Sequence, residues 1–306
     1  MKVQVSLIQD NPVFFDTPAT IAKMKTLIAQ EADSGAELIV FPESFVPGYP
    51  RGFDFGAVVG SRTDEGRALY ARYKSASITI EGPEMQELVD YCAGLSVYLV
   101  FGFTEKRSNN GSLYCSMAYI SPTAGLMAVH RKIKPTGTER LIWAEAGVAS
   151  LVAVDTSIGR LGGLICWENY MPLARMSMYR QGVQIYIAPT ADSRDAWLHT
   201  MKHIALEGRC YVLSCNQFFT KSMYPDDLRT LVSDMEEDIC NGGSVIIDPL
   251  GNEVSAPLYG QSGVARATID LAIVDGSKLD FDVNGHYTRD DIFDLRIIGL
   301  PDLIKE

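Results

Sequence analysis

Two kinds of hydrophobic pattern alternate at the start of the chain. Residues 2–9 alternate apolar and polar side chains before turning apolar, which predicts a strand, whereas residues 17–32 carry apolar side chains three or four positions apart, which predicts a helix. Ser34 and Gly35 end that helix, and residues 37–41 form a short apolar stretch typical of a buried strand. A strand, a helix and a second strand in succession predict an α/β fold.

The same rhythm continues to about residue 270. Helical spacing recurs at residues 63–76, 83–95, 173–181 and 197–207. Apolar stretches of strand length lie between these segments. Glycine turns separate the last predicted strands, at residues 243–249, 251–257 and 263–269.

One stretch, residues 221–238, is polar, acidic and weakly patterned. We expect a surface loop with one helical turn there, and a lid is a hypothesis for its role. No linker rich in glycine and serine and no low-complexity block interrupts the chain. We therefore expect a single domain over residues 1–306, with a tail from about residue 270 that packs on the domain or on a neighbouring subunit.

Composition and charge exclude several classes of partner. With 47% hydrophobic and 21% charged residues the chain has the balance of a globular protein. A net charge of −11 without a basic block argues against nucleic acid and anionic membranes. No apolar run approaches the ~20 residues of a membrane helix. Because the amino terminus also lacks an apolar segment followed by a small-residue cleavage site, we expect no export signal and a cytoplasmic location.

The cysteines and histidines do not form a metal-binding pattern. The six cysteines are scattered without a CxxC pair, which in a chain without a signal predicts free thiols in a reducing compartment. The four histidines form no HExxH motif and no cluster with cysteine. We expect neither a metal site nor a cofactor.

Three reactive side chains follow predicted buried strands within a few residues: Glu43, Lys132 and Cys166. If these strand ends meet at one rim of a sheet, a carboxylate, an ammonium and a thiol come together. A thiol must lose its proton to attack, and a carboxylate in apolar surroundings can accept that proton. The ammonium can stabilise the negative charge that develops on the attacked group.

Each of these residues also has a plainer interpretation. Glu43 could cap a turn, Lys132 could belong to a solvated face, and an unpaired cysteine is often simply core. Another base also stays open, because His130 would point the same way as Lys132 along a strand.

Four separated blocks of the chain resemble the signature blocks of the nitrilase superfamily. They read FPESFVPGYP from Phe41, RKIKPT from Arg131, ERLIW from Glu139 and CWEN from Cys166. The segments after Lys132 and Cys166 resemble the nitrilase branch more than its amidases. The similarity covers nearly the whole chain and includes residues 201–210, 242–244 and 282–287.

The resemblance implies a fold, a site and an assembly. The implied fold is a four-layer α-β-β-α sandwich, and the implied triad is Glu43, Lys132 and Cys166, with Glu139 as a second glutamate beside it. Gly137 stands where the loop of the nitrilase branch often has histidine, which leaves the triad intact and bears on substrate preference. Members of the superfamily tend to form homo-oligomers, so we expect dimers or larger spirals.

The activity that follows is hydrolysis of a small-molecule nitrile to the carboxylic acid and ammonia through covalent thioimidate and thioester intermediates. An amidase, or an enzyme that stops at the amide, is the alternative within the superfamily. A non-catalytic scaffold would lack a triad member, and all three are present. Aromatic side chains near the triad either line the substrate pocket or belong to the core. We expect Tyr49, Trp167, Phe53 and Trp143 to line the pocket.

Overall fold

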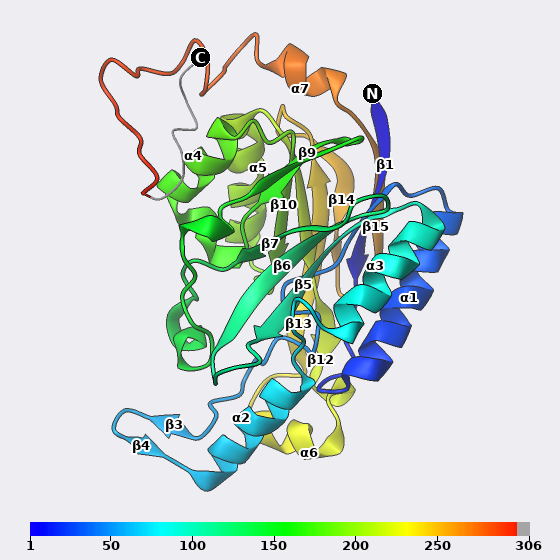
Figure 1. Cartoon of the computed structure of the whole chain (residues 1–306), viewed down its shortest axis with the longest axis vertical. Coiled ribbons are helices and arrows are strands. Elements are labelled where there is room, and N and C mark those ends of the chain that lie inside the picture. The colour runs from blue at the N-terminus through cyan, green and yellow to red at the C-terminus, as the bar shows by residue number, and fades with distance from the viewer. Residues whose placement is uncertain (299–306) are drawn as a thin grey trace.

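Two β-sheets pack face to face between two layers of helices (Figure 1). The structure is a computed structural model, and it describes residues 1–298. The first sheet has the order β15 (Gly263–Asp270), β1 (Lys2–Gln9), β2 (Leu38–Val40), β5 (Tyr98–Lys106), β6 (Leu113–Ser121) and β7 (Gly125–Arg131). The second has the order β12 (Phe218–Thr220), β13 (Asp238–Ile247), β11 (Tyr211–Asn216), β10 (Ile185–Thr190), β9 (Gly159–Gly163) and β8 (Ala153–Thr156), with β14 (Glu253–Tyr259) paired to β13.

The outer layers are helical pairs. Helices α1 (Thr17–Asp33) and α3 (Pro83–Leu95) cover the first sheet, and α4 (Pro172–Arg180) and α5 (Asp195–Gly208) cover the second. A separate apolar cluster fills the space between the two sheets. The α-β-β-α sandwich that the resemblance implied is therefore confirmed. The remaining elements are β3 (Ala57–Val58), β4 (Ser61–Arg62), α2 (Asp64–Ala76), α6 (Asp226–Arg229) and α7 (Ala272–Ser277).

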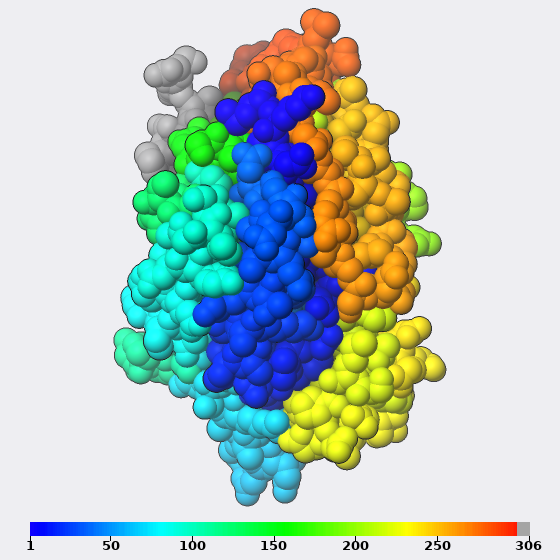
Figure 2. Space-filling view, turned by 90° about the vertical axis from the view of Figure 1, so that its right-hand side faces the viewer, coloured from blue at the N-terminus to red at the C-terminus, as the bar shows by residue number. Residues whose placement is uncertain are grey.

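The first strand shows how the sequence pattern produces this layering. Val3, Val5 and Leu7 of β1 face the core between the sheets, whereas Ile8 packs on the helical side. β1 pairs in parallel with β2 and antiparallel with β15, with Lys2 opposite Asp270. Figure 2 shows the consequence, since the blue N-terminal segment and the orange C-terminal strand lie side by side. Both faces of β1 are covered in its second half, where the polar Ser6 and Gln9 are buried together with Leu7 and Ile8.

The strand ends that carry the candidate residues come from both sheets. β7 runs antiparallel to β6, which runs antiparallel to β5, so β7 and the parallel pair β2–β5 end at the same edge. Cys166 follows β9 of the second sheet. The prediction that all three strand ends share one sheet rim was thus wrong in one respect. The site forms between two facing sheets, because their ends meet across the central core.

The stretch 221–238 is more ordered than the expected surface loop. It contains the predicted helical turn, α6, together with 3-10 turns at residues 221–223 and 230–232. Tyr224, Leu228 and Val232 are buried against Phe14 and neighbouring apolar side chains. Their spacing of four is helical, but the acidic residues between them conceal it in the sequence.

The segment after α7 returns to the domain, as Figure 1 shows. Val283 and Ile297 pack on the core between the second sheet and its helices. Arg180 of α4 pairs with Asp290 at 2.5 Å. Contact of this tail with a neighbouring subunit stays a prediction, and its last part, residues 299–306, lies outside the described residues. None of the helices in residues 1–298 combines the length and apolar character that a membrane crossing requires.

Gly102 of β5 gives the loop that contains Glu43 room to approach the first sheet. A Cβ at Gly102 would lie 2.3 Å from the Pro42 carbonyl oxygen and 2.6 Å from Glu43 Cα. Backbone hydrogen bonds join the same segments, from Gly102 N–H to Pro42 at 3.1 Å and from Phe45 N–H to Gly102 at 2.8 Å. Glycine at this position therefore sets the position of Glu43.

We predict that Gly102→Ala lowers the free energy of unfolding by about 1–3 kcal/mol, because the added methyl group overlaps backbone atoms that cannot rotate away. Urea denaturation measures this change. Gly94→Ala is the matched control, since nothing lies within 4 Å of a Cβ there and alanine favours the helix. A Gly102→Ala protein as stable as the wild type would contradict this account.

Candidate active site

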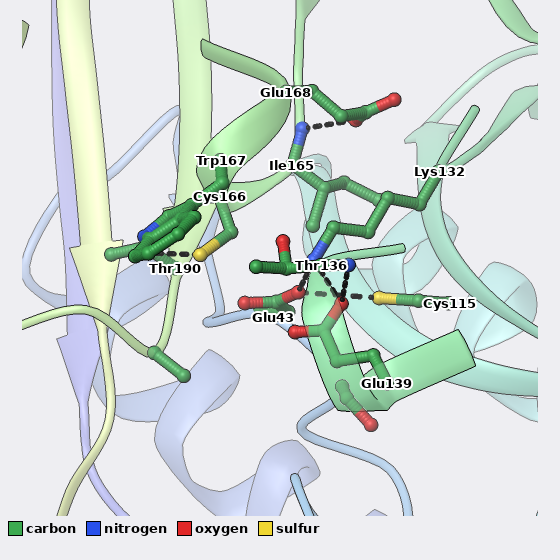
Figure 3. Close-up of polar contacts among 12 residues, drawn as sticks. Glu43, Cys115, Lys132, Thr136, Glu139, Ile165, Cys166, Trp167, Glu168 and Thr190 are labelled. Carbon is green, nitrogen blue, oxygen red and sulfur yellow. Dashed lines mark hydrogen bonds and ion pairs between the residues drawn. The ribbon is translucent and has the colours of Figure 1, made fainter. Parts of the chain in front are cut away.

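A buried lysine joins two of the predicted residues. Lys132 Nζ donates to Glu43 Oε1 at 2.7 Å and to Glu139 Oε2 at 2.8 Å, and the side chains of Lys132 and Glu43 are fully buried (Figure 3). An ammonium has three donors. Within residues 1–298 the third N–H of Lys132 has no protein acceptor, so it can face a bound molecule.

Glu43 is held by its backbone and leaves one oxygen free. Gln217 Nε2 donates to the Glu43 carbonyl at 2.6 Å, and the Cys115 thiol approaches Oε1 at 3.5 Å. Oε2 is buried and has no hydrogen-bond partner among the described residues. Burial raises the pKa of Glu43 above its ordinary value, although the Lys132 ammonium opposes the rise. Glu43 therefore has both a free oxygen and the basicity to accept a proton.

Glu139 lies in a 3-10 turn, Gly137–Leu141, that follows the lysine. Its Oε2 also accepts the Thr136 N–H at 2.7 Å, and its Oε1 accepts the Tyr49 hydroxyl at 2.7 Å. Gly137, the first residue of this turn, has φ +49°. Glycine adopts this left-handed conformation without steric cost. The carboxylate is thus fixed by donors on three sides.

Cys166 begins a second 3-10 turn, Cys166–Tyr170, directly after β9. Its φ of +49° is strained for a residue with a side chain, and such strain persists only where the surroundings hold it. Asn169 provides part of that support, since its Nδ2 donates to the carbonyls of Leu164 at 2.9 Å and Cys166 at 2.8 Å. Tyr186 in turn donates to Asn169 Oδ1 at 2.8 Å.

The surroundings of Cys166 favour the protonated thiol. Burial raises its pKa well above the ordinary range, and the nearby Glu43 carboxylate raises it further, whereas Lys132 and Thr190 oppose the rise. A thiolate here would place one more negative charge beside two carboxylates. The sulfur can become nucleophilic only as a base takes its proton.

Thr190 contacts the sulfur directly, and sequence reasoning missed it. Its Oγ1 donates to Cys166 Sγ at 3.2 Å and accepts the Asp192 N–H at 3.0 Å (Figure 3). Thr190 ends β10, which runs parallel to β9, so both strands bring their carboxyl ends to the site. The apolar stretch at residues 183–188 predicts a strand, and the polar PTAD segment directly after it was the signal that could have identified Thr190.

A cavity of about 570 Å³ opens over Cys166. Tyr49, Phe53 and Trp167 line it, as the sequence predicted, together with Arg51, Phe55, Thr136, Leu141, Ile142, Asp192 and Arg194. Asp192 and Arg194, which the sequence did not point to, form a polar part of the cavity wall beside Trp167. Trp167 Nε1 donates to Asp192 Oδ2 at 2.8 Å, and the Arg194 guanidinium lies 4.9 Å from the centroid of the Trp167 ring. Burial alone would raise the pKa of Asp192, but its hydrogen bonds with Arg194 lower it.

Trp143 and His130 lie elsewhere than expected. Trp143 is buried behind Tyr49, with ring centroids 5.6 Å apart, and it does not line the cavity. Its position in the sequence beside the catalytic blocks does not reveal which way its ring points. His130 hydrogen-bonds to Glu168 at 2.8 Å and to the Ser150 carbonyl oxygen at 2.5 Å instead of facing the thiol, so the alternative that it is the base was wrong.

Comparison with known proteins identifies relatives over nearly the whole chain. The family model for carbon-nitrogen hydrolase matches residues 4–278. The chain is 42% identical to the bifunctional nitrilase/nitrile hydratase NIT4A of Nicotiana tabacum, over 96% of this chain and 85% of the relative, and 42% identical to the aliphatic nitrilase of Sinorhizobium fredii (strain HH103), over 98% and 97%. Its fold is similar to that of Saccharomyces cerevisiae Nit3, a member of the nitrilase superfamily, with a TM-score of 0.75 at 19% identity over 94% of this chain and 96% of Nit3.

We predict that Thr190→Val slows alkylation of Cys166 by iodoacetamide about tenfold at a fixed alkaline pH, because a hydrogen bond to a charged sulfur is worth about 1.5–3 kcal/mol. Mass spectrometry of the Cys166 peptide over time measures the rate. Thr190→Ser, which keeps the hydroxyl, should react like the wild type. An unchanged rate in the valine variant would show that the hydroxyl does not stabilise the thiolate.

Proposed function

Because the chain belongs to the carbon-nitrogen hydrolase family and, within it, to the nitrilases, we propose that it hydrolyses an organic nitrile to the carboxylic acid and ammonia. The observation that carries this proposal is the Cys166 thiol at the base of the cavity, beside the buried group of Glu43, Lys132 and Glu139. The identity of 42% to proteins named as nitrilases supports the choice of nitriles. A cavity of about 570 Å³ suits a small molecule.

The first chemical step uses the free oxygen of Glu43. As the sulfur of Cys166 attacks the nitrile carbon, Glu43 accepts the thiol proton and a carbon–sulfur bond replaces one carbon–nitrogen π bond. The negative charge that develops on the nitrile nitrogen is stabilised by the third N–H of Lys132. The nitrogen then takes up a proton, and the product is a covalent thioimidate.

Water completes the reaction in two additions. Glu43 activates the first water, which adds to the thioimidate carbon and gives a tetrahedral intermediate. Expulsion of ammonia leaves a thioester, and a second water releases the carboxylic acid and restores the thiol. Glu139 keeps Lys132 oriented throughout, because its carboxylate is fixed by Tyr49 and Thr136.

A second outcome is possible at the tetrahedral intermediate. If the sulfur leaves instead of ammonia, the product is the amide, after the addition of only one water. The bifunctional name of the Nicotiana tabacum relative supports this as a side reaction or an alternative product. Incubation with a panel of nitriles and amides, read by ammonia release and by the ratio of acid to amide, separates a nitrilase from an amide-forming enzyme and from an amidase.

Assembly and location complete the proposal. Exposed apolar side chains at the start of α4, such as Leu173 at 70% exposure, offer a surface that a second copy could cover in a homo-oligomer. All six cysteines are unpaired, which suits the reducing cytoplasm. Light scattering during size-exclusion chromatography measures the oligomer size.

We predict that Cys166→Ala abolishes ammonia release from every nitrile that the wild type accepts, because among the described residues Cys166 is the one cysteine that lines the cavity and the covalent intermediate forms on its sulfur. Cys92→Ala removes a buried thiol from α3, far from the cavity, and should retain activity. Substantial turnover by a correctly folded Cys166→Ala protein would overturn the proposed mechanism.

The raised pKa of Glu43 predicts an acid limit to activity. A raised pKa means that the carboxyl keeps its proton at higher pH than an ordinary glutamate, so the base is lost as pH falls through that value. The acid limb of the profile of kcat/KM against pH should therefore lie above the ordinary glutamate pKa of about 4.3. A profile that stays flat to lower pH would argue against Glu43 as the base.

A further inference from the structure

The carboxylate of Glu168 joins the two backbone segments that carry the lysine and the cysteine. Oε1 accepts the Ile133 N–H at 2.6 Å, and Oε2 accepts the Ile165 N–H at 2.7 Å. Ile133 directly follows Lys132, and Ile165 directly precedes Cys166. Figure 3 shows Glu168 on the opposite side of Lys132 and Cys166 from Glu43. None of the proposed chemical steps uses this carboxylate.

Glu168 also links the two sheets. Lys132 follows β7 of the first sheet, and Cys166 follows β9 of the second, so the two backbone segments are not neighbours in any hydrogen-bonded ladder. Their relative position otherwise depends on side-chain packing and on indirect links such as the hydrogen bond from Gln217 to the Glu43 carbonyl. A fully buried carboxylate that accepts an N–H from each segment fixes the distance between them.

His130 completes the arrangement and carries a proton. Its Nε2 lies 2.8 Å from Glu168 Oε2, and its Nδ1 lies 2.5 Å from the Ser150 carbonyl oxygen. The Ser150 carbonyl can only accept, so Nδ1 donates to it. An ionised Glu168 also only accepts, so Nε2 donates as well and the imidazole is positively charged. Burial alone would lower the pKa of His130, but Glu168 and the Ser150 carbonyl outweigh it and raise the pKa above the ordinary value. The charge on His130 compensates the buried carboxylate.

We propose that Glu168, held by a protonated His130, is a positioning residue that sets the separation between the Lys132 ammonium and the Cys166 sulfur. The inference deepens the proposed function and, for its effect on turnover, rests on it. The hydrogen bonds of Glu168 go to two backbone N–H groups and to His130, so the arrangement acts through the backbone. Displacement of a reacting group by 1 Å can reduce a rate about a hundredfold.

Glu168→Gln tests the inference with minimal change in shape. An amide offers only one oxygen, and its NH₂ group cannot accept an N–H. If the amide nitrogen faces His130, which then becomes neutral and accepts, the Ile165 N–H loses its acceptor while Ile133 keeps its own. In the opposite orientation Ile133 loses its acceptor instead. Either orientation releases one of the two segments.

We predict that Glu168→Gln lowers kcat at least about tenfold, with KM changed less than about threefold, because substrate contacts remain while the reacting groups shift. Alkylation of Cys166 by iodoacetamide should slow in parallel, since the ammonium is less well placed to stabilise the thiolate. Steady-state kinetics, the alkylation rate and circular dichroism are measured on the same preparations.

Glu105→Gln is the matched control. Glu105 is also a buried carboxylate near the end of β7, where it pairs with Arg131 at 2.6 Å, but it contacts neither Ile133 nor Ile165. It should lose stability without a fall in kcat or in the alkylation rate. Equal effects of Glu105→Gln and Glu168→Gln on these rates, or a folded Glu168→Gln protein with the kcat of the wild type, would overturn the inference.

Failure of the proposed function and failure of the Glu168→Gln protein to fold can each be distinguished from failure of the inference. If the wild type hydrolyses no nitrile, the proposed function fails, whereas the alkylation rates of the two glutamine variants still test the positioning role. If Glu168→Gln does not fold, His130→Gln serves instead, because it removes the compensating charge and leaves the carboxylate. A folded His130→Gln protein with wild-type kcat and alkylation rate would then overturn the inference.

Discussion

The burial of the Lys132 ammonium is the interaction on which the rest of the site depends. An isolated buried charge costs several kcal/mol even after the protein relaxes, so this lysine is tolerated only because two carboxylates approach it within 3 Å. Two carboxylates around one ammonium leave an excess of negative charge. Burial of the neighbouring thiol, together with that excess, raises the pKa of Cys166, which is the physical reason why its chemistry needs a base.

The same constraint explains how the backbone is built around the site. Glu43 approaches the first sheet because Gly102 has no side chain, and Glu139 is turned inward by the 3-10 turn that begins at Gly137. Lys132 itself is held through its N–H, which donates to the Cys115 carbonyl at 2.7 Å. Each of these charged residues is therefore held by contacts of its own backbone as well as by the ion pairs. A flexible site could not keep these charges paired away from water.

The fold was predictable in outline because hydrophobic periodicity reports which faces of an element are buried. The expected helix at residues 83–95 coincides with α3, and most other elements lie within a few residues of their predicted bounds. Predictions failed where a side chain's direction depends on distant packing. Trp143 stands next to the catalytic blocks in the sequence but packs behind Tyr49, and His130 turns from the thiol toward Glu168. Thr190 was missed because its segment shows that it follows a strand but does not show that this strand, β10, lies beside β9.

The sequence by itself determined which groups can react and that each follows a strand, because strand periodicity and strand ends are local properties of the chain. The expectation that all three strands are buried was wrong for β7, which precedes Lys132 and is mostly only partly buried as the last strand of its sheet. The motif blocks also determined the family, since four of them occur in the right order. Only the tertiary structure decided which charges pair, which oxygen of Glu43 stays free and which side chains reach the sulfur. These depend on distances between residues as far apart as Glu43 and Cys166, and such distances are set by the packing of one sheet against the other.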